Sequence, residues 1–208
     1  MNAPELYVNF FQAFANVARK DHYDYVGTDR PHGQAASFEA LLAFRNCCRD
    51  AGLTHVSPIL DAGAGASSAV LRNWFGNVTS CDPNAEYLID VKKACAALAN
   101  FYKLPHLGSG DWVPGFPQSG VFDACFYDYG AIERKPNLEQ AIRMTKHIVY
   151  VDDADNRADC LEMRMFVFET LNKVEGWIPV DALCAEDEHQ RWGIMLVRPE
   201  SWNSTRPC

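Results

Sequence analysis

Long apolar runs are missing from this sequence, and none approaches the roughly 20 consecutive apolar residues that span a bilayer. An excess of positive charge is missing too, because 19 Lys and Arg residues stand against 27 Asp and Glu residues, for a formal net charge of −8. A protein that binds phosphates along a nucleic acid needs a basic surface. These absences predict a protein with neither a membrane nor a nucleic-acid partner. The first residues, MNAPE, also lack the basic start and apolar core of a signal peptide, which favours a cytoplasmic location.

Pairs of cysteines at metal-binding spacing are also absent. None of the eight cysteines forms a C-x-x-C motif, so no structural zinc site is predicted. Cys47 and Cys48 are adjacent, a poor geometry for a mutual disulfide. Cys81 and Cys125 lie inside apolar segments, where thiols act as small core residues. Cysteine usage therefore favours a reducing compartment.

Short apolar runs alternate with helical patterns along most of the chain. Strands are predicted at residues 56–60, 78–81, 103–107, 121–127 and 147–151, with helices at 66–75, 84–102, 138–145 and 155–172 between and after them. Two further runs, 177–185 and 191–198, are separated by a short acidic turn, which permits only an antiparallel hairpin. The pattern predicts a three-layer α/β sandwich with a seven-stranded, mostly parallel sheet and an antiparallel C-terminal hairpin.

The first 50 residues precede this alternation. Tyr7, Phe10, Phe11 and Phe14 have the spacing of one helix face, and residues 35–51 predict a second helix that ends at Gly52. Residues 21–34 between them are polar and aromatic. They read either as a surface connection or as a substrate lid, and the sequence leaves both open.

Four predicted strands are followed by an aspartate, at Asp61, Asp82, Asp128 and Asp152. Ligands of open α/β sheets bind outside the carboxyl ends of the strands. A row of carboxylates there is costly to bury without a partner. The arrangement favours a ligand that carries hydrogen-bond donors and positive charge.

The first of these aspartates opens the segment Asp61-Ala62-Gly63-Ala64-Gly65, between a predicted strand and a predicted helix. Glycines at such a turn let a ligand lie against the main chain, and the helix N-terminus favours an anionic group. A tight strand-to-helix turn with no ligand is the alternative. Asp82 could accept hydrogen bonds from the two hydroxyls of a ribose. Alternatively, it could be the N-cap of the next helix, with Pro83 as the first helical residue.

These motifs, together with Gly110-Asp111-Trp112 and the segment Phe122-Asp123-Ala124-Cys125-Phe126-Tyr127-Asp128, resemble class I S-adenosylmethionine-dependent methyltransferases. The resemblance covers residues 50–200 and is nearest the small-molecule, catechol-type O-methyltransferases. It implies a Rossmann-like fold in one domain, 1–208, in which residues 51–200 form the cofactor-binding core and residues 1–50 are a helical extension that shapes the substrate site. It also implies a small-molecule methyl acceptor and leaves a homodimer as an option.

The resemblance assigns roles around the cofactor S-adenosylmethionine. The assigned residues are Gly63 and Gly65 under the methionine part, Ser67 near its carboxylate, Asp61 at its amino group, Asp82 at the ribose, Asp111 and Trp112 at the adenine, and Asp128 at the methionine part or the acceptor. Tyr129 would pack against the methyl donor or acceptor, or be a core tyrosine. Tyr25 and His32, in the 21–34 loop, are candidate substrate residues.

The catechol-type branch also binds a divalent cation. Asp128 matches the acid that this branch has at the end of its fourth strand, and Asp152-Asp153 resembles its Asp-Asn pair at the end of the fifth, with Asp in place of Asn. All-oxygen ligands suit Mg²⁺ or Ca²⁺. The chain departs from that branch at Ala131, where the resemblance would place a lysine base. The metal-free alternative is that Asp153 caps the following helix.

Two other function classes remain open. Gly63-x-Gly65-x-x-Ser68 nearly fits the fingerprint of an NAD(P)-dependent oxidoreductase, although Asp61 and the antiparallel tail fit that class poorly. A catalytically silent binding module that keeps the cofactor fold is the other. The leading prediction is a methyltransferase that acts on a small molecule, at oxygen.

Overall fold

The computed structural model describes residues 2–19, 36–129, 134–154, 161–180 and 193–201. Its strands form a single seven-stranded sheet in the order β3-β2-β1-β4-β5-β7-β6. The strands are β1 (Pro58–Ala62), β2 (Asn77–Asp82), β3 (Asp111–Pro114), β4 (Phe122–Tyr127), β5 (Thr145–Val151), β6 (Ile178–Val180) and β7 (Ile194–Val197). The first five are parallel, and β7 runs antiparallel to both β5 and β6. The predicted sheet and its antiparallel hairpin are confirmed.

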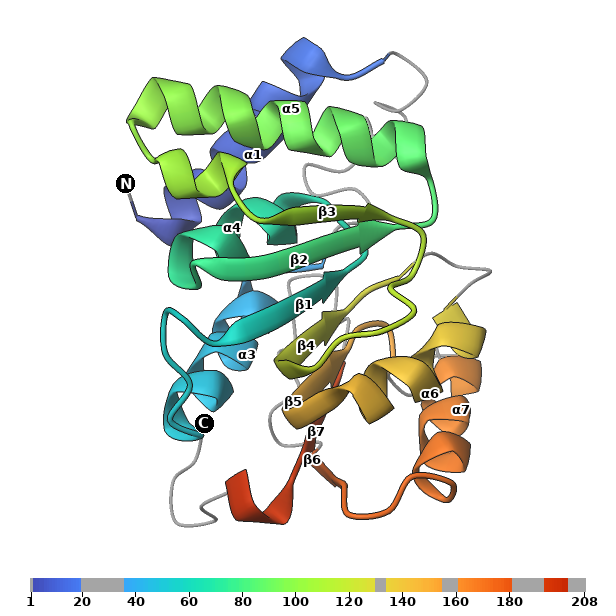
Figure 1. Cartoon of the computed structure of the whole chain (residues 1–208). Coiled ribbons are helices and arrows are strands. Elements are labelled where there is room, and N and C mark those ends of the chain that lie inside the picture. The colour runs from blue at the N-terminus through green and yellow to red at the C-terminus, as the bar shows by residue number, and fades with distance from the viewer. Residues whose placement is uncertain (1, 20–35, 130–133, 155–160, 181–192, 202–208) are drawn as a thin grey trace.

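Helices cover both faces of this sheet, so the molecule has three layers (Figure 1). One face packs against α1 (Ala3–Val17), α3 (Phe38–Asp50), α4 (Ala66–Trp74) and α5 (Ala85–Tyr102). The other packs against α6 (Arg134–Met144) and α7 (Leu161–Leu171). Short 3-10 helices lie at η1 (Pro105–Gly108) and η3 (Pro199–Ser201). None of the described helices combines the length and hydrophobicity that a membrane crossing requires.

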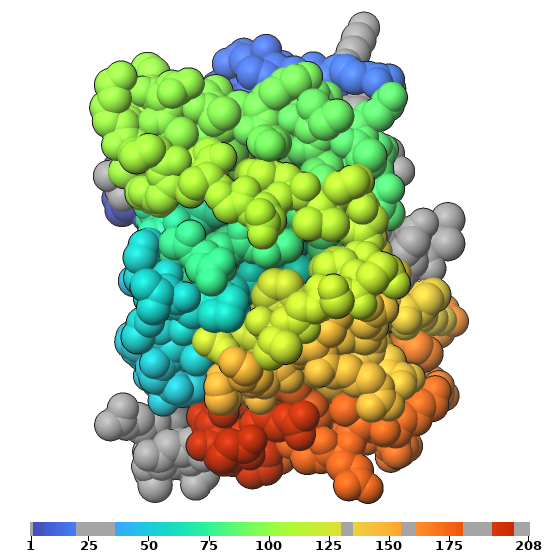
Figure 2. Space-filling view, viewed as in Figure 1, coloured from blue at the N-terminus to red at the C-terminus, as the bar shows by residue number. Residues whose placement is uncertain are grey.

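The central strands are buried on both faces, as parallel strands between two helical layers require. In β4, Ala124 and Phe126 pack in the core beneath α1, α3, α4 and α5, whereas Cys125 and Tyr127 pack in the core beneath α6 and α7. In the space-filling view from the same side, atoms fill the region between α5 and α6 where the strands lie in Figure 1 (Figure 2). The described cysteines at positions 47, 48, 81, 95 and 125 are buried. Cys81 and Cys125 therefore act as core residues, as predicted.

The strand predicted at residues 103–107 is wrong. Helix α5 ends at Lys103 in the left-handed conformation, with φ of 59°, and η1 follows at Pro105. Strand β3 forms later, at Asp111–Pro114, on the edge of the sheet. An edge strand of four partly exposed residues needs no alternation of apolar side chains, so the sequence pattern did not reveal it.

The two N-terminal helices are observed as predicted. Tyr7, Phe10 and Phe14 of α1 are buried, and the Tyr7 hydroxyl donates a hydrogen bond of 2.8 Å to the backbone oxygen of Ala36. The Phe14 ring lies 5.5 Å from the ring of Tyr87, in the first turn of α5. The N-terminal extension therefore packs against the same end of α5 that follows β2. Its part in shaping a substrate site stays a prediction.

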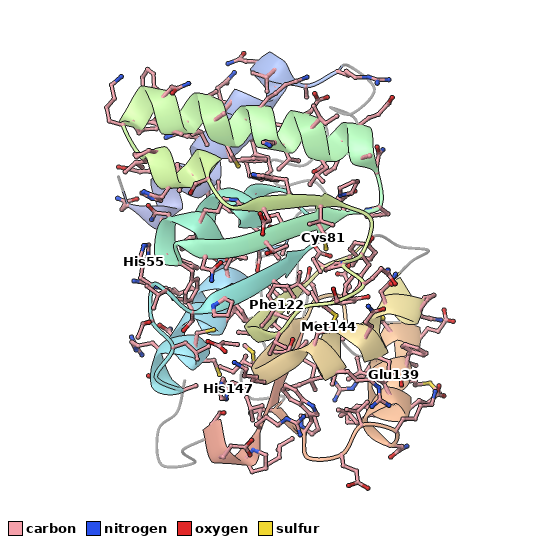
Figure 3. The ribbon with its side chains drawn as sticks, viewed as in Figure 1. His55, Cys81, Phe122, Glu139, Met144 and His147 are labelled. Carbon is pink, nitrogen blue, oxygen red and sulfur yellow. The ribbon has the colours of Figure 1, made fainter. Side chains whose placement is uncertain are left out.

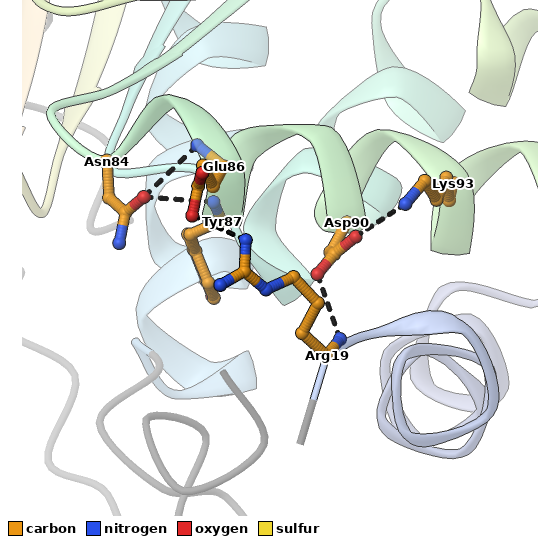
Figure 4. Close-up of polar contacts among 6 residues, drawn as sticks. All are labelled: Arg19, Asn84, Glu86, Tyr87, Asp90 and Lys93. Carbon is orange, nitrogen blue, oxygen red and sulfur yellow. Dashed lines mark hydrogen bonds and ion pairs between the residues drawn. The ribbon is translucent and has the colours of Figure 1, made fainter. Parts of the chain in front are cut away.

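A buried carboxylate fastens the end of this extension to α5 (Figure 4). Asp90 is 1% exposed and accepts hydrogen bonds from the Arg19 backbone N–H, at 2.9 Å, and from Lys93 Nζ, at 2.8 Å. The Arg19 guanidinium pairs with Glu86, but both side chains of that pair are more than half exposed.

We expect Asp90→Ala to lower the free energy of unfolding by about 2–3 kcal/mol, because it removes a buried, charged acceptor from the Arg19 N–H. Glu86→Ala is the matched control on the same arginine. It should cost about 0–1 kcal/mol, as exposed ion pairs do. Urea denaturation of both variants measures the difference, and equal losses would contradict this account of the contact.

Candidate functional site

The carboxyl ends of the parallel strands meet along one edge of the sheet, where their arrowheads point in Figure 1. Strands β2, β1, β4 and β5 are neighbours in that order, so Asp82, Asp61, Asp128 and Asp152 follow one another along the sheet. The predicted row of strand-end aspartates is therefore present. The labelled His55 and His147 lie near the opposite edge from Cys81 (Figure 3), which excludes these two histidines as bases at this site.

The turn from β1 to α4 is held against both neighbouring strands. The N–H groups of Gly63 and Ala64 donate to the Cys81 oxygen at 2.9 and 3.1 Å, and the Asp128 N–H donates to the Ala62 oxygen at 2.7 Å. Gly63 has φ of 99°, and a methyl group there would overlap the backbone oxygen of Asp128. This position thus requires glycine, both for its conformation and for the approach of β4.

Gly65 has a different reason to be glycine. Its φ of 178° is open to any residue, and a methyl group there would lie 3.6 Å from the Tyr87 hydroxyl, an ordinary contact. The fold therefore does not require glycine at this position. A ligand that lies against the main chain at the N-terminus of α4 would require it.

Asp61 lies inside the protein, beneath the turn. It is 0% exposed, and its carboxylate accepts hydrogen bonds from the hydroxyls of Ser67 at 2.8 Å, Ser68 at 2.5 Å and Ser80 at 2.7 Å. Burial raises the pKa of Asp61, and the three hydroxyls oppose that rise. The resemblance implied that Asp61 meets the amino group of the cofactor and Ser67 its carboxylate. In the structure these two side chains hydrogen-bond each other and Asp61 also holds the first turn of α4, so their contacts with a cofactor stay a prediction.

Asp82 ends β2 and is 9% exposed. Its Oδ1 accepts a 2.8 Å hydrogen bond from the Asn84 N–H. Asn84 is the N-cap of α5 and accepts from the N–H groups of Glu86 and Tyr87. The alternative in which Asp82 caps this helix is therefore wrong. Asp82 follows Cys81, whose backbone oxygen accepts from the glycine turn, and its role at a ribose stays a prediction.

Tyr87 is a candidate site residue that sequence reasoning missed. Its hydroxyl lies over Gly65, and its pKa is raised by burial and by the carboxylates of Asp82, Asp128 and Asp61. The tyrosine thus lies among the strand-end acids. One signal was available, since the residue three positions after an N-cap lies in the first turn, close to the preceding strand end.

Asp128, Asp152 and Asp153 form a cluster at the ends of β4 and β5. One carboxylate oxygen from each lies within 4.8 Å of the others. Tyr150 orients the middle member by donating a 2.9 Å hydrogen bond to Asp152 Oδ1. Three carboxylates at this spacing fit a hard divalent cation such as Mg²⁺ or Ca²⁺. Lys135, the first lysine after Ala131, forms an ion pair with Glu162 of α7.

Asp111 and Trp112 do not join this group. Asp111 is the first residue of β3 and pairs with Thr79 of β2. Asp82, at the carboxyl end of β2, pairs instead with Pro114, the last residue of β3. The Trp112 ring lies 4.0 Å from the Arg72 guanidinium, on which it stacks. The adenine contacts that the resemblance implied for this pair are therefore not supported by where the strand lies.

Tyr129 is 1% exposed and packs in a buried aromatic cluster. Its ring lies 5.3 Å from that of Phe116, in the segment after β3, and 6.2 Å from that of Tyr127. The alternative of a core tyrosine fits this position better than a contact with the reacting groups. Tyr25 and His32 lie outside the described residues.

No protein-family model and no curated protein matches the chain. Solved structures do match over nearly its whole length. An O-methyltransferase from Bacillus cereus, in complex with SAH, has a TM-score of 0.62 at 12% identity and covers 93% of this chain and 90% of its own. The O-methyltransferase TomG from Streptomyces achromogenes, in complex with SAM, has a TM-score of 0.54 at 17% identity, covering 90% and 89%.

A magnesium protoporphyrin IX methyltransferase from Synechocystis, with bound SAH, has a TM-score of 0.58 at 11% identity and covers 86% of this chain and 93% of its own. The three proteins differ in the acceptors that their names suggest. What they share with this chain is the arrangement of the sheet and its helices. The chain has the Rossmann-like fold of the class I S-adenosylmethionine-dependent methyltransferases.

Proposed function

We propose that this protein is an S-adenosylmethionine-dependent methyltransferase that methylates a small molecule at oxygen. The observation that carries the proposal is the Gly63–Gly65 turn, pinned between the ends of β2 and β4 with Asp82 on one side and Asp128 on the other. Gly65 supports the proposal further, because the fold does not require glycine there and the missing side chain lets a ligand approach the main chain. The antiparallel β7 fits a dinucleotide-dependent oxidoreductase poorly.

Each residue then has a defined task. The turn and the N-terminus of α4 would bind the methionine carboxylate, and Asp82 would accept from both ribose hydroxyls. Tyr87, whose hydroxyl lies over Gly65, would help to exclude water from the site. The bound cofactor supplies an electrophilic methyl group on a sulfonium. The protein contributes mainly by aligning two reactants in a dry site, which can lower the barrier by up to about 7–11 kcal/mol.

Calorimetric titration with S-adenosylhomocysteine tests the cofactor half of this proposal. We expect saturable one-site binding and, at a ligand concentration of 100 times Kd, a stabilisation of about 2.7 kcal/mol. Asp82→Ala should weaken binding by about 1.5–3 kcal/mol, because it removes a charged acceptor from the ribose. Asp123→Ala is the matched control, since Asp123 lies at the amino end of β4 and pairs with Lys146. Absence of binding by the unaltered protein would overturn the proposal.

Asp128, Asp152 and Asp153 would hold a divalent cation, which would orient two acceptor oxygens and favour loss of a proton from one of them. We expect dialysis against EDTA to remove activity toward phenols and added Mg²⁺ or Mn²⁺ to restore it. Asp152→Asn should also abolish Mn²⁺ binding measured by electron paramagnetic resonance without cofactor. Full activity after dialysis would rule out the metal.

The acceptor itself requires a turnover screen with phenols, carboxylic acids and amines, and with RNA as the contrasting class. The acidic chain, with its net charge of −8, favours the small molecules. Cofactor binding without turnover of any acceptor would support the silent binding module instead.

A further inference from the structure

Arg72 is a buried cation that the proposed function leaves unexplained. It lies in α4, is 1% exposed, and its guanidinium stacks on the ring of Trp112. Nη1 donates to the backbone oxygens of Val78 at 3.0 Å and Ser109 at 2.5 Å. Nη2 donates to the Asp111 backbone oxygen at 3.0 Å and to the Ser80 hydroxyl at 2.9 Å. Burying a charge this fully is costly, so these contacts must offset a large desolvation penalty.

The contact with Ser80 sets the direction of a hydrogen-bond chain. A guanidinium can only donate, so the Ser80 oxygen accepts from Arg72 and its hydrogen is directed to Asp61 Oδ2 at 2.7 Å. The same logic applies to Ser68, whose oxygen accepts from the Gly65 N–H at 3.2 Å and whose hydrogen goes to Asp61 Oδ2. Two hydroxyl donors thus converge on one carboxylate oxygen, which requires that oxygen to be an acceptor.

The hydrogen-bond chain therefore runs from Arg72 through Ser80, Asp61 and Ser68 to the N–H of Gly65. Gly65 lies in the turn against which the cofactor would lie. We propose that Arg72 is a positioning residue for the cofactor site: by fixing the Ser80 hydroxyl it keeps Asp61 a hydrogen-bond acceptor and so holds the Gly65 turn in its binding geometry. The proposal rests on the proposed function and concerns how this chain builds the cofactor site.

The pKa shifts of Asp61 and Arg72 agree with this role of Arg72. Burial raises the pKa of Asp61, while its serine partners and the Arg72 charge lower it. Burial lowers the pKa of Arg72, and the charges of Cys95, Asp61 and Asp111 raise it. Without Arg72, the rise in the Asp61 pKa would be opposed less, so Asp61 would take up a proton at a higher pH. A protonated Asp61 can no longer accept from all three serines, so cofactor affinity should fall as pH falls through that pKa.

Other titratable groups near Asp61 come from three neighbouring elements. On α5, burial raises the pKa of Cys95 to about 12 and also raises that of Tyr87. Burial raises the pKa of Cys81 on β2 and of Cys125 on β4. These groups stay protonated between about pH 6 and about pH 9. The remaining carboxylates nearby are Asp82, Asp111 and Asp128, so an Asp61→Asn background is needed to assign any pH effect.

The test is S-adenosylhomocysteine affinity as a function of pH, measured by calorimetry on three single and two double variants. Arg72→Met should weaken binding by about tenfold at pH 7 and shift the pH midpoint of affinity upward by on the order of one unit. Arg72→Lys, which keeps the charge, should lie between Arg72→Met and the unaltered protein. Ser80→Ala should weaken binding without adding to the effect of Arg72→Met in the double variant. Asp61→Asn combined with Arg72→Met should lose the shifted pH midpoint.

A merely structural Arg72 would lower stability without moving the pH profile, and that result would overturn the inference. Ser57→Ala is the control for loss of a buried serine, since Ser57 caps the turn at Thr54 before β1. If Arg72→Met does not fold, Arg72→Lys and Ser80→Ala decide the question, and unchanged affinity in both overturns the inference. Failure of the unaltered protein to bind the ligand would instead overturn the proposed function.

Discussion

Gly63→Ala should destabilise the protein by about 2–5 kcal/mol and abolish cofactor binding. The glycine has φ of 99°, where a residue with a side chain costs about 1–2 kcal/mol. The added methyl group would also overlap the Asp128 backbone oxygen, and such overpacking costs about 1–3 kcal/mol more. Since small domains are stable by about 5–15 kcal/mol, this is a large fraction of the total.

Alanine substitutions at two other glycines distinguish the cost of backbone strain from the cost of steric overlap. Gly52→Ala meets the same conformational strain, at φ of 79°, but has no atom within 4 Å, so it should cost only about 1–2 kcal/mol. Gly65→Ala has neither strain nor overlap and should change stability by less than about 0.5 kcal/mol. It should nevertheless weaken binding of S-adenosylhomocysteine, because its methyl group would project where the cofactor lies. Urea denaturation and calorimetry give the two readouts, and unimpaired binding by Gly65→Ala would contradict the proposed pose.

Asp61→Leu should cost about 3–5 kcal/mol, the second large effect. It leaves the buried guanidinium of Arg72 without its negative counterpart and leaves the hydroxyls of Ser67, Ser68 and Ser80 without their acceptor. The loss arises from uncompensated polar groups and, to a smaller extent, from overpacking, because leucine has the branching of aspartate but bulkier methyl groups in place of the two oxygens.

The double variant Asp61→Leu with Arg72→Leu tests that reason. Asp61 and Arg72 are buried opposite charges joined through the Ser80 hydroxyl. Replacing both members of such a buried pair is often close to neutral, so the double variant should be more stable than Asp61→Leu alone. Chemical denaturation with equal m-values would make the comparison valid. A double variant less stable than either single one would mean that Arg72 and Asp61 support the fold independently.

The elements that the sequence predicted best are those with strong local patterns. The helix at Ala85–Tyr102 has a continuous apolar stripe and a capped start, and the central strands are short apolar runs that end at an aspartate. The edge strand at Asp111–Pro114 was missed because its burial is too slight to leave a pattern. The segment before it was misread because Pro105 and the left-handed Lys103 redirect the chain.

Local spacing and the common direction of parallel strands are enough to predict the layered α/β architecture, the glycine turn and the row of strand-end acids. The surroundings of those acids could be seen only in the folded structure. It placed Asp61 under three serine hydroxyls, brought Asp128 within reach of Asp152 and Asp153, set Tyr87 over Gly65, and moved Asp111 away from the site. These outcomes depend on strand register and on which face a side chain takes, and both are fixed by packing between distant segments.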